Sequence, residues 1–371
     1  MKQARTIPLQ LLLFFSLGTC SVAGLARAED TTAEPAKPSE QLKKILARFP
    51  QSDANADGIL TRSEAIAFFQ ARREKSSTGD GPMRQAKKKG AASDPAHADI
   101  AYGDHAKQTF DLWLPPGVTE PSPVVLFIHG GGFRSGDKSA VPQKVVDQYL
   151  DAGVAFAAIN YRLSDVGPYP IMMNDCARAL QTIRHRAAEW NLDPERIASY
   201  GGSAGAGISL WLGFHDDLAD PDSSDPVSRQ STRVIAVGTM NGQSTCDIND
   251  FRDWFGIPDL RPGPALPAFY AVESEKDWDS DRVRKLMKEA SSINHLTKDD
   301  VPVYMFYSRP NSPVTADTES SVWVHHVQLG LKLQEAMAEV GLECIVTSPD
   351  LVPADAPHRS LEEFLIAKLS K

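Results

Sequence analysis

The stretch Ser199-Tyr-Gly-Gly-Ser-Ala-Gly-Ala-Gly207 decides how this sequence folds. Runs rich in glycine and serine are usually flexible linkers, so the flanking residues matter. Residues 196–201 (RIASYG) form a short apolar pattern typical of a buried strand, and residues 204–214 (AGAGISLWLGF) begin a helix. The segment GGSAG at 201–205 is therefore predicted to be a sharp strand-to-helix turn, the context in which G-x-S-x-G presents a serine nucleophile.

The chemistry of this turn centres on Ser203. Glycines are needed beside it because the backbone is strained and its neighbours are close, so side chains would clash. The helix that follows directs its N-terminal N–H groups toward the serine and favours negative charge developing there. We therefore predict that Ser203 is a catalytic nucleophile.

A second glycine-rich loop, HGGGFRSGD at 129–137, follows directly after an apolar strand predicted at 124–128. An oxyanion hole needs backbone N–H groups aimed at one point, and glycines allow a substrate to approach them. The predicted donors are Gly131 and Gly132, joined by Ala204, the residue after the nucleophile. His129 is predicted to hold this loop by hydrogen bonding.

The chain from about residue 100 onward alternates strands with helices. Strands are predicted at 110–115, 123–129, 154–162, 196–201, 233–242, 301–308 and 342–348, with helices at 171–190 and 326–340 among the segments between them. Such alternation predicts an α/β domain with a mostly parallel sheet and helices on both faces.

Together these motifs resemble the α/β-hydrolase superfamily, and within it the HGGG carboxylesterases of the hormone-sensitive-lipase-like and feruloyl or acetyl-xylan esterase-like branch. The matching segments occur in the family's order: HGGGFRSGD, INYRL, YPIMMNDCARAL, DPERIASYGGSAGA and DAPHRSLEEFL. The resemblance implies an α/β-hydrolase fold over residues 100–371 and a serine esterase that forms an acyl-enzyme. Many relatives carry an acid before the serine, where this chain has Gly202.

The general base is expected on a loop after the last strand, where the chain carries His358. His325 and His326 precede a helix and are assigned to its N-terminal turn. The scheme is thus a Ser203–His358 pair, in which the histidine takes the serine proton and returns it to the leaving group.

The third member of the triad is where the chain departs from its relatives. The resemblance places an aspartate just after the seventh strand, and Asn311 stands there. An asparagine carbonyl can orient the imidazole but supplies no charge to stabilise the imidazolium. Two alternatives stay open: Asp317 or Glu319 reaches His358, or the site has no functional third member.

A different motif, DANADGILTRSE at 53–64, fits the calcium-loop pattern D-x-[DN]-x-[DN]-G-x5-E. Oxygen ligands recur at alternate positions because the loop must wrap around a cation. Helical patterns on both sides predict a single EF-hand at 40–73 with a structural calcium ion. The predicted ligands are Asp53, Asn55, Asp57, the Ile59 carbonyl, Thr61 and Glu64.

The remaining segments and the net charge indicate the expected location of the protein and the kinds of partner it can have. Residues 1–28 have the basic start, apolar run and small-residue end of a signal peptide, so the protein is expected to be secreted or periplasmic. Residues 29–39 are predicted to be a tether and 74–99 a linker. A formal net charge of -9 argues against nucleic acid as a partner. Pairing among Cys176, Cys246 and Cys344 stays open.

The sequence thus predicts a secreted serine carboxylesterase that hydrolyses small acyl esters, with acetyl or feruloyl esters of polysaccharides implied by the resemblance. No cofactor is expected in catalysis, and no stable membrane span in the mature chain. Two alternatives are kept: a calcium-binding scaffold of hydrolase fold with weakened turnover, and a serine peptidase of the same fold. Oligomeric state stays open.

Overall fold

The computed structural model describes residues 43, 46–47, 49–55, 57–61, 64, 68, 94–352 and 357–371. The chain forms two compact units, Met1–Lys88 and Lys89–Lys371, and each is described by itself. The predicted signal peptide at 1–28, the tether at 29–39 and the linker up to residue 93 lie outside the described residues.

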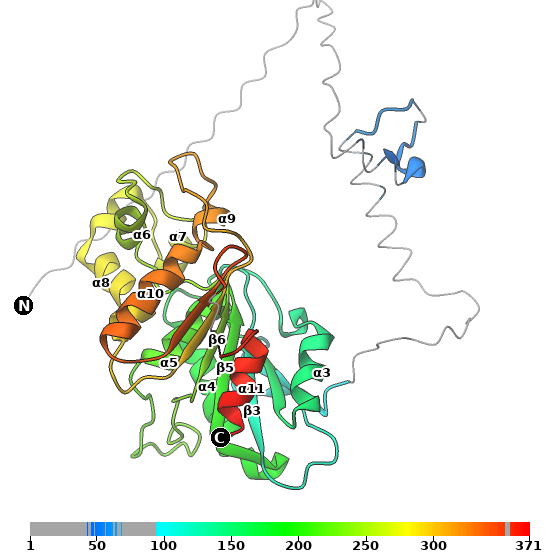
Figure 1. Cartoon of the computed structure of the whole chain (residues 1–371), viewed down its shortest axis with the longest axis vertical. Coiled ribbons are helices and arrows are strands. Elements are labelled where there is room, and N and C mark those ends of the chain that lie inside the picture. Colours follow the sequence, from blue (N-terminus) through cyan, green and yellow to red (C-terminus); the bar gives the residue numbers. More distant parts are fainter. Residues whose placement is uncertain are drawn as a thin grey trace, which may run out of the picture. The chain divides into compact units, whose positions relative to one another are not determined.

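The second unit is built on a central β-sheet (Figure 1). Over the described residues this sheet has eight strands, in the order β1-β2-β4-β3-β5-β6-β7-β8. β1 and β2 pair antiparallel with each other and β2 pairs antiparallel with β4, whereas the other neighbours are parallel. The strands are β1 His97–Ala101, β2 Thr109–Trp113, β3 Ser122–Ile128, β4 Ala155–Ile159, β5 Leu192–Gly202, β6 Val237–Met240, β7 Val303–Phe306 and β8 Cys344–Thr347.

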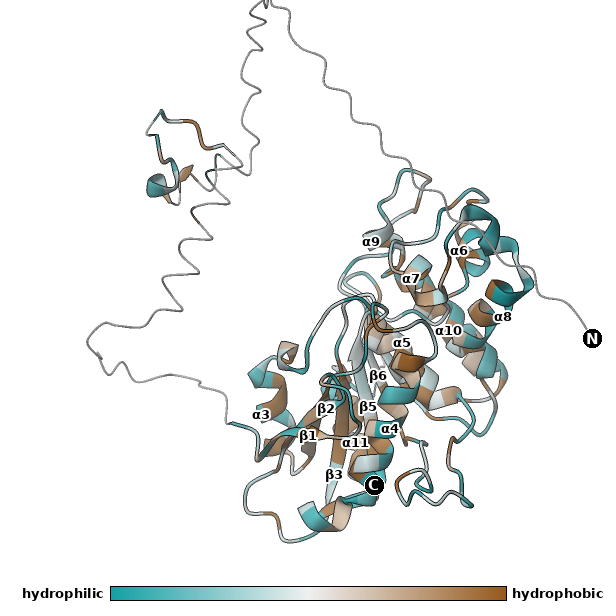
Figure 2. Cartoon of the chain, turned by 180° about the vertical axis from the view of Figure 1, so that it is seen from behind, coloured by the Kyte–Doolittle hydropathy of each residue, from teal (hydrophilic) through white to brown (hydrophobic). Residues whose placement is uncertain are grey.

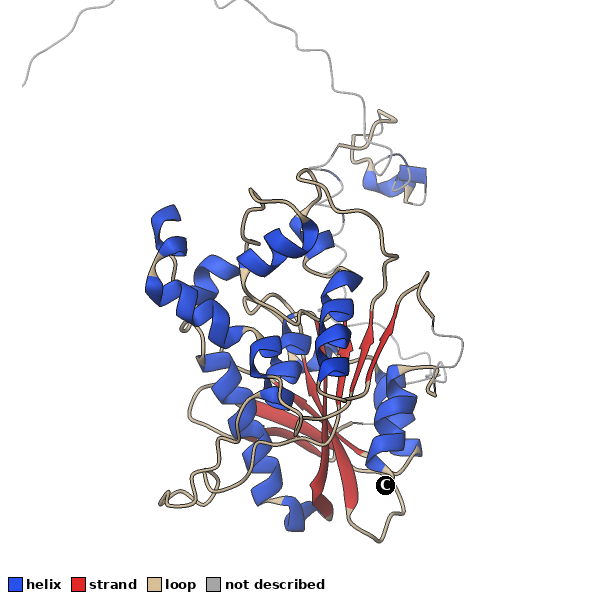
Figure 3. Ribbon diagram, turned by 60° about the vertical axis from the view of Figure 1, so that its left-hand side comes forward, coloured by secondary structure: helices blue, strands red, loops and turns tan. Residues whose placement is uncertain are grey.

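Helices cover both faces of this sheet, as Figure 3 shows. The α-helices are α3 Gln143–Asp151, α4 Ile171–His185, α5 Ala204–Phe214, α6 Ile248–Phe255, α7 Leu266–Tyr270, α8 Asp281–Ala290, α9 Ser320–Trp323, α10 Val327–Glu339 and α11 Leu361–Leu369. The short 3-10 helices of this unit are η2 Lys138–Ala140, η3 Ala187–Trp190, η4 Glu275–Asp279 and η5 Ser292–His295, whereas η1 Pro50–Ser52 belongs to the first unit.

The core lies on both sides of the central strands because their side chains alternate between faces. On β3, Val124 and Leu126 belong to the larger apolar cluster, which α4, α5 and α10 cover, whereas Val125 and Phe127 belong to the cluster under α3 and α11. Strands buried on both faces read as continuous apolar runs. Figure 2 shows this hydrophobic colouring along the central strands.

The predicted α/β-hydrolase fold is confirmed in architecture, and the predicted strands are present. One strand was not predicted: β1 begins at His97, within the segment assigned to the linker. The predicted helix at 171–190 is two elements, since α4 ends at His185 and η3 follows. Within the described residues, no helix is both long and apolar enough to cross a membrane. Cys176, Cys246 and Cys344 are free thiols.

Candidate active site

The turn after β5 has the geometry of a nucleophile elbow. Ser203 sits between β5 and α5 with φ 51° and ψ -119°, a strained conformation for a residue with a side chain. A Cβ on Gly205 would lie 2.0 Å from the Ile128 carbonyl oxygen, so only glycine fits there. The role predicted for the glycines around Ser203 is confirmed: they permit close backbone approach.

The sheet register brings the HGGG loop beside this elbow. Ile128, the last residue of β3, pairs with Gly201 on the parallel strand β5, so both strands deliver their following loops to the same edge. Gly131 has φ 117°, and a Cβ there would lie 2.0 Å from the Ser135 carbonyl oxygen. The Nδ1–H of His129 donates to the Gly130 carbonyl at 2.8 Å, so this histidine holds the loop as predicted.

The side chain that meets Ser203 is His325. Its Nε2 lies 2.7 Å from the Ser203 Oγ, and its Nδ1 lies 2.9 Å from the Ser321 carbonyl oxygen. A carbonyl can only accept, so the ring proton is on Nδ1 and the lone pair on Nε2 faces the serine hydroxyl. This is the tautomer that a general base needs. Burial lowers the pKa of His325, which keeps the ring neutral.

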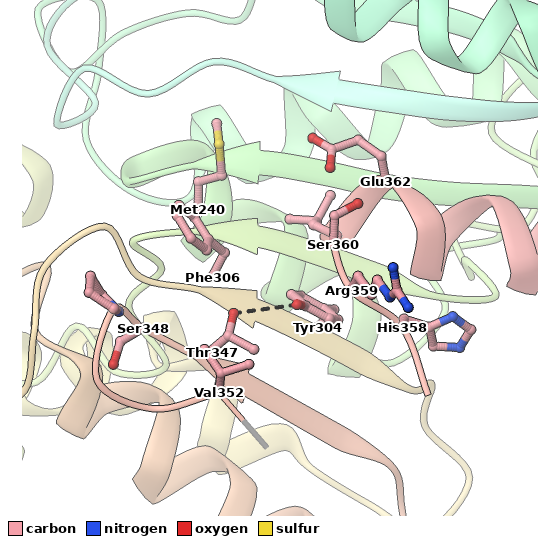
Figure 4. Close-up of a pocket in the computed structure, with 12 residues that line it drawn as sticks. Met240, Tyr304, Phe306, Thr347, Ser348, Val352, His358, Arg359, Ser360 and Glu362 are labelled. Carbon is pink, nitrogen blue, oxygen red and sulfur yellow. Dashed lines mark hydrogen bonds between the residues drawn. The ribbon is translucent and has the colours of Figure 1, made fainter. Parts of the chain in front are cut away.

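This geometry corrects the expectation that His358 meets the nucleophile. His358 lies after β8, packs edge-on against Phe364 of α11 at 5.4 Å, and lines a separate cavity of about 810 Å³. Figure 4 shows it at the opposite end of that cavity from Met240, whose carbonyl accepts the Ser203 N–H. The physical reason is chain path: the β7–α10 connection folds over the elbow, whereas the described chain after 356 turns directly into α11.

The residues that were expected to complete the triad do not contact His325 either. The N–H of Asn311 donates to the Asp350 carboxylate at 2.9 Å, and Asn311, Asp317 and Glu319 are all exposed. The place beside Nδ1 is taken by the Ser321 carbonyl. A main-chain oxygen therefore orients the imidazole of His325, a role that was expected of a side chain.

Both ring nitrogens of His326, the neighbour of His325, make hydrogen bonds that stabilise the start of α10 and the preceding loop. Its Nδ1 accepts the Gln328 N–H at 3.1 Å as the N-cap of α10, and its Nε2–H donates to the Ser312 carbonyl at 2.8 Å. The prediction that this residue belongs to the helix start is confirmed, whereas its neighbour points to the nucleophile. The two adjacent histidines thus have different tasks.

An apolar cavity of about 350 Å³ opens onto the pair. Ser203 and His325 line it together with the predicted oxyanion residues Gly131, Gly132 and Ala204. Three aromatic side chains of its lining pack against other rings: Phe133 stacks on Phe269 at 4.3 Å, and Phe251 meets Trp323 edge-on at 5.0 Å. The structure therefore places Ser203, His325 and the predicted oxyanion loop around one pocket.

The calcium-like loop belongs to the first unit and is described at each of its predicted ligand positions. Asp53 Oδ2 accepts the Gly58 N–H at 2.8 Å, Asp57 Oδ1 accepts the Ile59 N–H at 2.8 Å, and Glu64 Oε2 accepts the Thr61 N–H at 3.0 Å. Gly58 has φ 80°, the left-handed turn expected at this position.

One oxygen of this loop lacks a hydrogen-bond partner among the residues that the structure describes. The Asp53 Oδ1 is buried and finds no hydrogen bond among the described residues. A buried anionic oxygen is costly unless something positive meets it. The oxygens of Asp53, Asn55, Asp57 and Glu64 are the hard donors that calcium prefers, so the residues present fit this ion.

A sequence model of the BD-FAE family matches residues 110–323, more than half of the chain. The chain belongs to the BD-FAE family. Its matched domain is that of a carboxylic ester hydrolase of the serine type. The match spans the HGGG loop, the elbow and the cavity walls and ends at Trp323, two residues before His325.

The comparisons with individual proteins agree with this family. The chain is 25% identical over 240 residues to a probable isoprenylcysteine alpha-carbonyl methylesterase of Arabidopsis thaliana, covering 65% of this chain and 49% of that protein. It is 27% identical to the probable carboxylic ester hydrolase LipM of Mycobacterium tuberculosis, covering 63% and 52%. The chain thus spans about half the length of these curated relatives.

A solved structure shows the same fold. A truncated carbohydrate esterase from gut microbiota superposes with a TM-score of 0.57 at 18% identity, covering 75% of this chain and all of the other. At this identity the likeness establishes the α/β-hydrolase architecture.

Proposed function

We propose that this protein is a serine carboxylesterase that hydrolyses small acyl esters, with acetyl or feruloyl esters of polysaccharides as the substrate class. The observation that carries the proposal is the 2.7 Å contact between Ser203 Oγ and His325 Nε2 inside an apolar cavity lined by the HGGG loop. The resemblance and the carbohydrate esterase of the same fold support a sugar as the alcohol.

In the proposed reaction, each group of the site takes part in one or more steps of ester hydrolysis. Ser203 Oγ attacks the ester carbonyl while its proton passes to His325 Nε2, and the carbonyl oxygen becomes an oxyanion. The N–H groups of Gly131, Gly132 and Ala204 would stabilise that oxyanion. His325 then gives its proton to the departing alcohol, and water activated by the same histidine cleaves the acyl-enzyme. The Ser321 carbonyl keeps the ring in the required tautomer throughout.

The size of the cavity supports a small acyl group. Its volume of about 350 Å³ is at the small end for ligand pockets, and its aromatic walls are packed against one another. A cavity of this volume leaves little room for a long flexible chain, whereas it can hold a short acyl group or a flat aromatic one.

An acyl series tests this proposal. With one alcohol held constant, kcat/KM for acetyl, butyryl and feruloyl esters is expected to exceed that for octanoyl and longer esters by about tenfold or more, since each misplaced methylene costs binding. Acetylated and feruloylated xylan fragments then separate the two polysaccharide substrates. Equal turnover of long-chain esters, or of a peptide substrate, would contradict the small-ester proposal.

We further propose that the first unit binds one calcium ion as a structural element and that residues 1–28 direct export. The calcium ligands would be Asp53, Asn55, Asp57, the Ile59 carbonyl, Thr61 and Glu64. The orphan Oδ1 of Asp53 supports this proposal. Calcium would supply positive charge to a loop of clustered oxygens and takes no part in ester hydrolysis.

Calcium binding is expected with a stoichiometry of one per chain by calorimetry. Glu64→Gln removes a charged, bidentate-capable donor and should weaken binding by at least about tenfold, whereas the exposed Asp104→Asn serves as a matched control. Ester turnover should be the same with calcium and with excess chelator. Unchanged calcium affinity in Glu64→Gln would remove this loop from consideration.

A further inference from the structure

A cluster of possible metal ligands lies at the end of α5 remote from Ser203. His215, Glu289 and His295 each offer one ligand atom, and these atoms lie within 4.8 Å of one another. His215 is the C-cap of α5, Glu289 belongs to α8 and His295 ends η5. Because α5 has 11 residues, it separates the cluster from the elbow by about 16 Å.

The hydrogen bonds of His215 leave a lone pair facing a carboxylate. Its Nδ1 lies 2.9 Å from the Asp216 carbonyl oxygen, so Nδ1 carries the ring proton. Nε2 lies 3.2 Å from Glu289 Oε1. Two acceptors therefore face each other at hydrogen-bond distance in the neutral ring, an arrangement that either a second proton on the ring or a metal ion between the two groups would stabilise.

His295 is held in the same way. Its Nε2 lies 2.7 Å from the Glu289 carbonyl oxygen, so Nε2 carries the proton and Nδ1 is left with the lone pair. Histidines that bind metals usually donate their other ring N–H to a carbonyl or carboxylate, which fixes the tautomer. Both rings of the cluster have this form, and Trp211 packs on the His215 ring at 4.0 Å.

We propose that His215, Glu289 and His295 bind one zinc-type divalent transition metal ion, with solvent completing the coordination. Two imidazoles and one carboxylate are a donor set that zinc takes with an open fourth position. The Glu289 side chain is 45% exposed, so solvent reaches the site. The C-terminal end of α5 also favours a cation, because its carbonyls carry partial negative charge.

The positive charge of the neighbouring Arg233 is already balanced by an acidic side chain. The guanidinium of Arg233 donates to the His215 carbonyl at 3.2 Å and pairs with the Asp300 carboxylate at 3.4 Å. The ion would connect three elements that are far apart in sequence: the end of α5, the end of α8 and η5. Its role is to brace the segment between β6 and β7 that supplies cavity walls, and it does not touch the reacting atoms.

Zinc titration of the whole chain, with any affinity tag removed and calcium present in excess, tests the site. One zinc ion per chain is expected, together with a rise in the unfolding temperature. His295→Gln and Glu289→Gln should each weaken zinc binding by at least about tenfold. His185→Gln, at an exposed histidine of α4, is the matched control and should bind zinc as the native chain does.

A second readout separates binding from misfolding. Cobalt in place of zinc should give the visible absorption of a low-coordinate nitrogen–oxygen site, lost in both ligand variants while ester turnover stays near native. Turnover shows that the variants are folded. Zinc affinity equal in His295→Gln and His185→Gln, or no zinc bound by the native chain, would overturn the proposal and leave His215 and Glu289 as a proton-mediated pair.

Discussion

Replacing Ser203 with alanine is expected to lower kcat for a short acyl ester by at least about three orders of magnitude, with the fold unchanged. The hydroxyl is the atom that forms the acyl-enzyme, and the only part of the side chain the variant loses. The Cβ stays in place, so the strained backbone at φ 51° keeps the same steric demands. The rate at which each protein hydrolyses a chromogenic acetyl ester measures the loss of kcat.

A control on the same helix isolates the chemistry. Ser209 lies buried in α5, and its Oγ has no hydrogen-bond partner among the described residues, so Ser209→Ala should keep near-native turnover. A fluorophosphonate probe should label the native chain and Ser209→Ala but not Ser203→Ala. Retention of more than about a tenth of the activity by Ser203→Ala would show that the nucleophile lies elsewhere.

The fold could be predicted from local patterns because each element that defines it has a recognisable pattern within a few consecutive residues. The apolar run of β3 and the G-x-S-x-G pattern of the elbow are both visible within a few consecutive residues. The physical need for glycine at 205 comes from a distant segment, the Ile128 carbonyl of the adjoining strand β3, but the glycine itself is present in the local pattern. The unpredicted strand β1 lacks this signal: most of its residues are exposed, and it is held by pairing with β2.

The base could not be assigned in the same way, because its position depends on the path of a long connection between β7 and α10. A signal was present in the pair of adjacent histidines. His326 satisfies both ring nitrogens as an N-cap, which leaves its neighbour free to point elsewhere. The orienting group at Ser321 is a main-chain carbonyl and has no signature in sequence at all.

The zinc-type cluster was hidden for a related reason. Its ligands lie on three elements, with His215 and Glu289 separated by 74 positions, so no spacing pattern connects them. The proposed calcium loop, by contrast, is contiguous, so its candidate ligands form a spacing pattern in the sequence. Contiguity decides which sites a single sequence reveals.

The two candidate bases can be separated by a matched pair of variants. His325→Gln is expected to lower kcat by at least about three orders of magnitude, because the lone pair that accepts the Ser203 proton is lost. His358→Gln should change kcat less than about threefold, since that ring packs on Phe364 and lines another cavity. Both substitutions remove one imidazole and keep a polar side chain of similar length.

The pH profile gives an independent check on which ring is the base. A general base must be neutral, so kcat/KM falls as pH drops through its pKa in the free enzyme. Burial lowers the pKa of His325 from its ordinary value of 6.5, and the hydrogen bond from Nδ1 to the Ser321 carbonyl opposes this shift only in part. The acidic limb of the native enzyme is therefore expected below pH 6.5 and unchanged in His358→Gln. If His358→Gln loses turnover while His325→Gln keeps it, the base stands after β8, where the chain order of the family places it, and the contact at Ser203 is a resting arrangement.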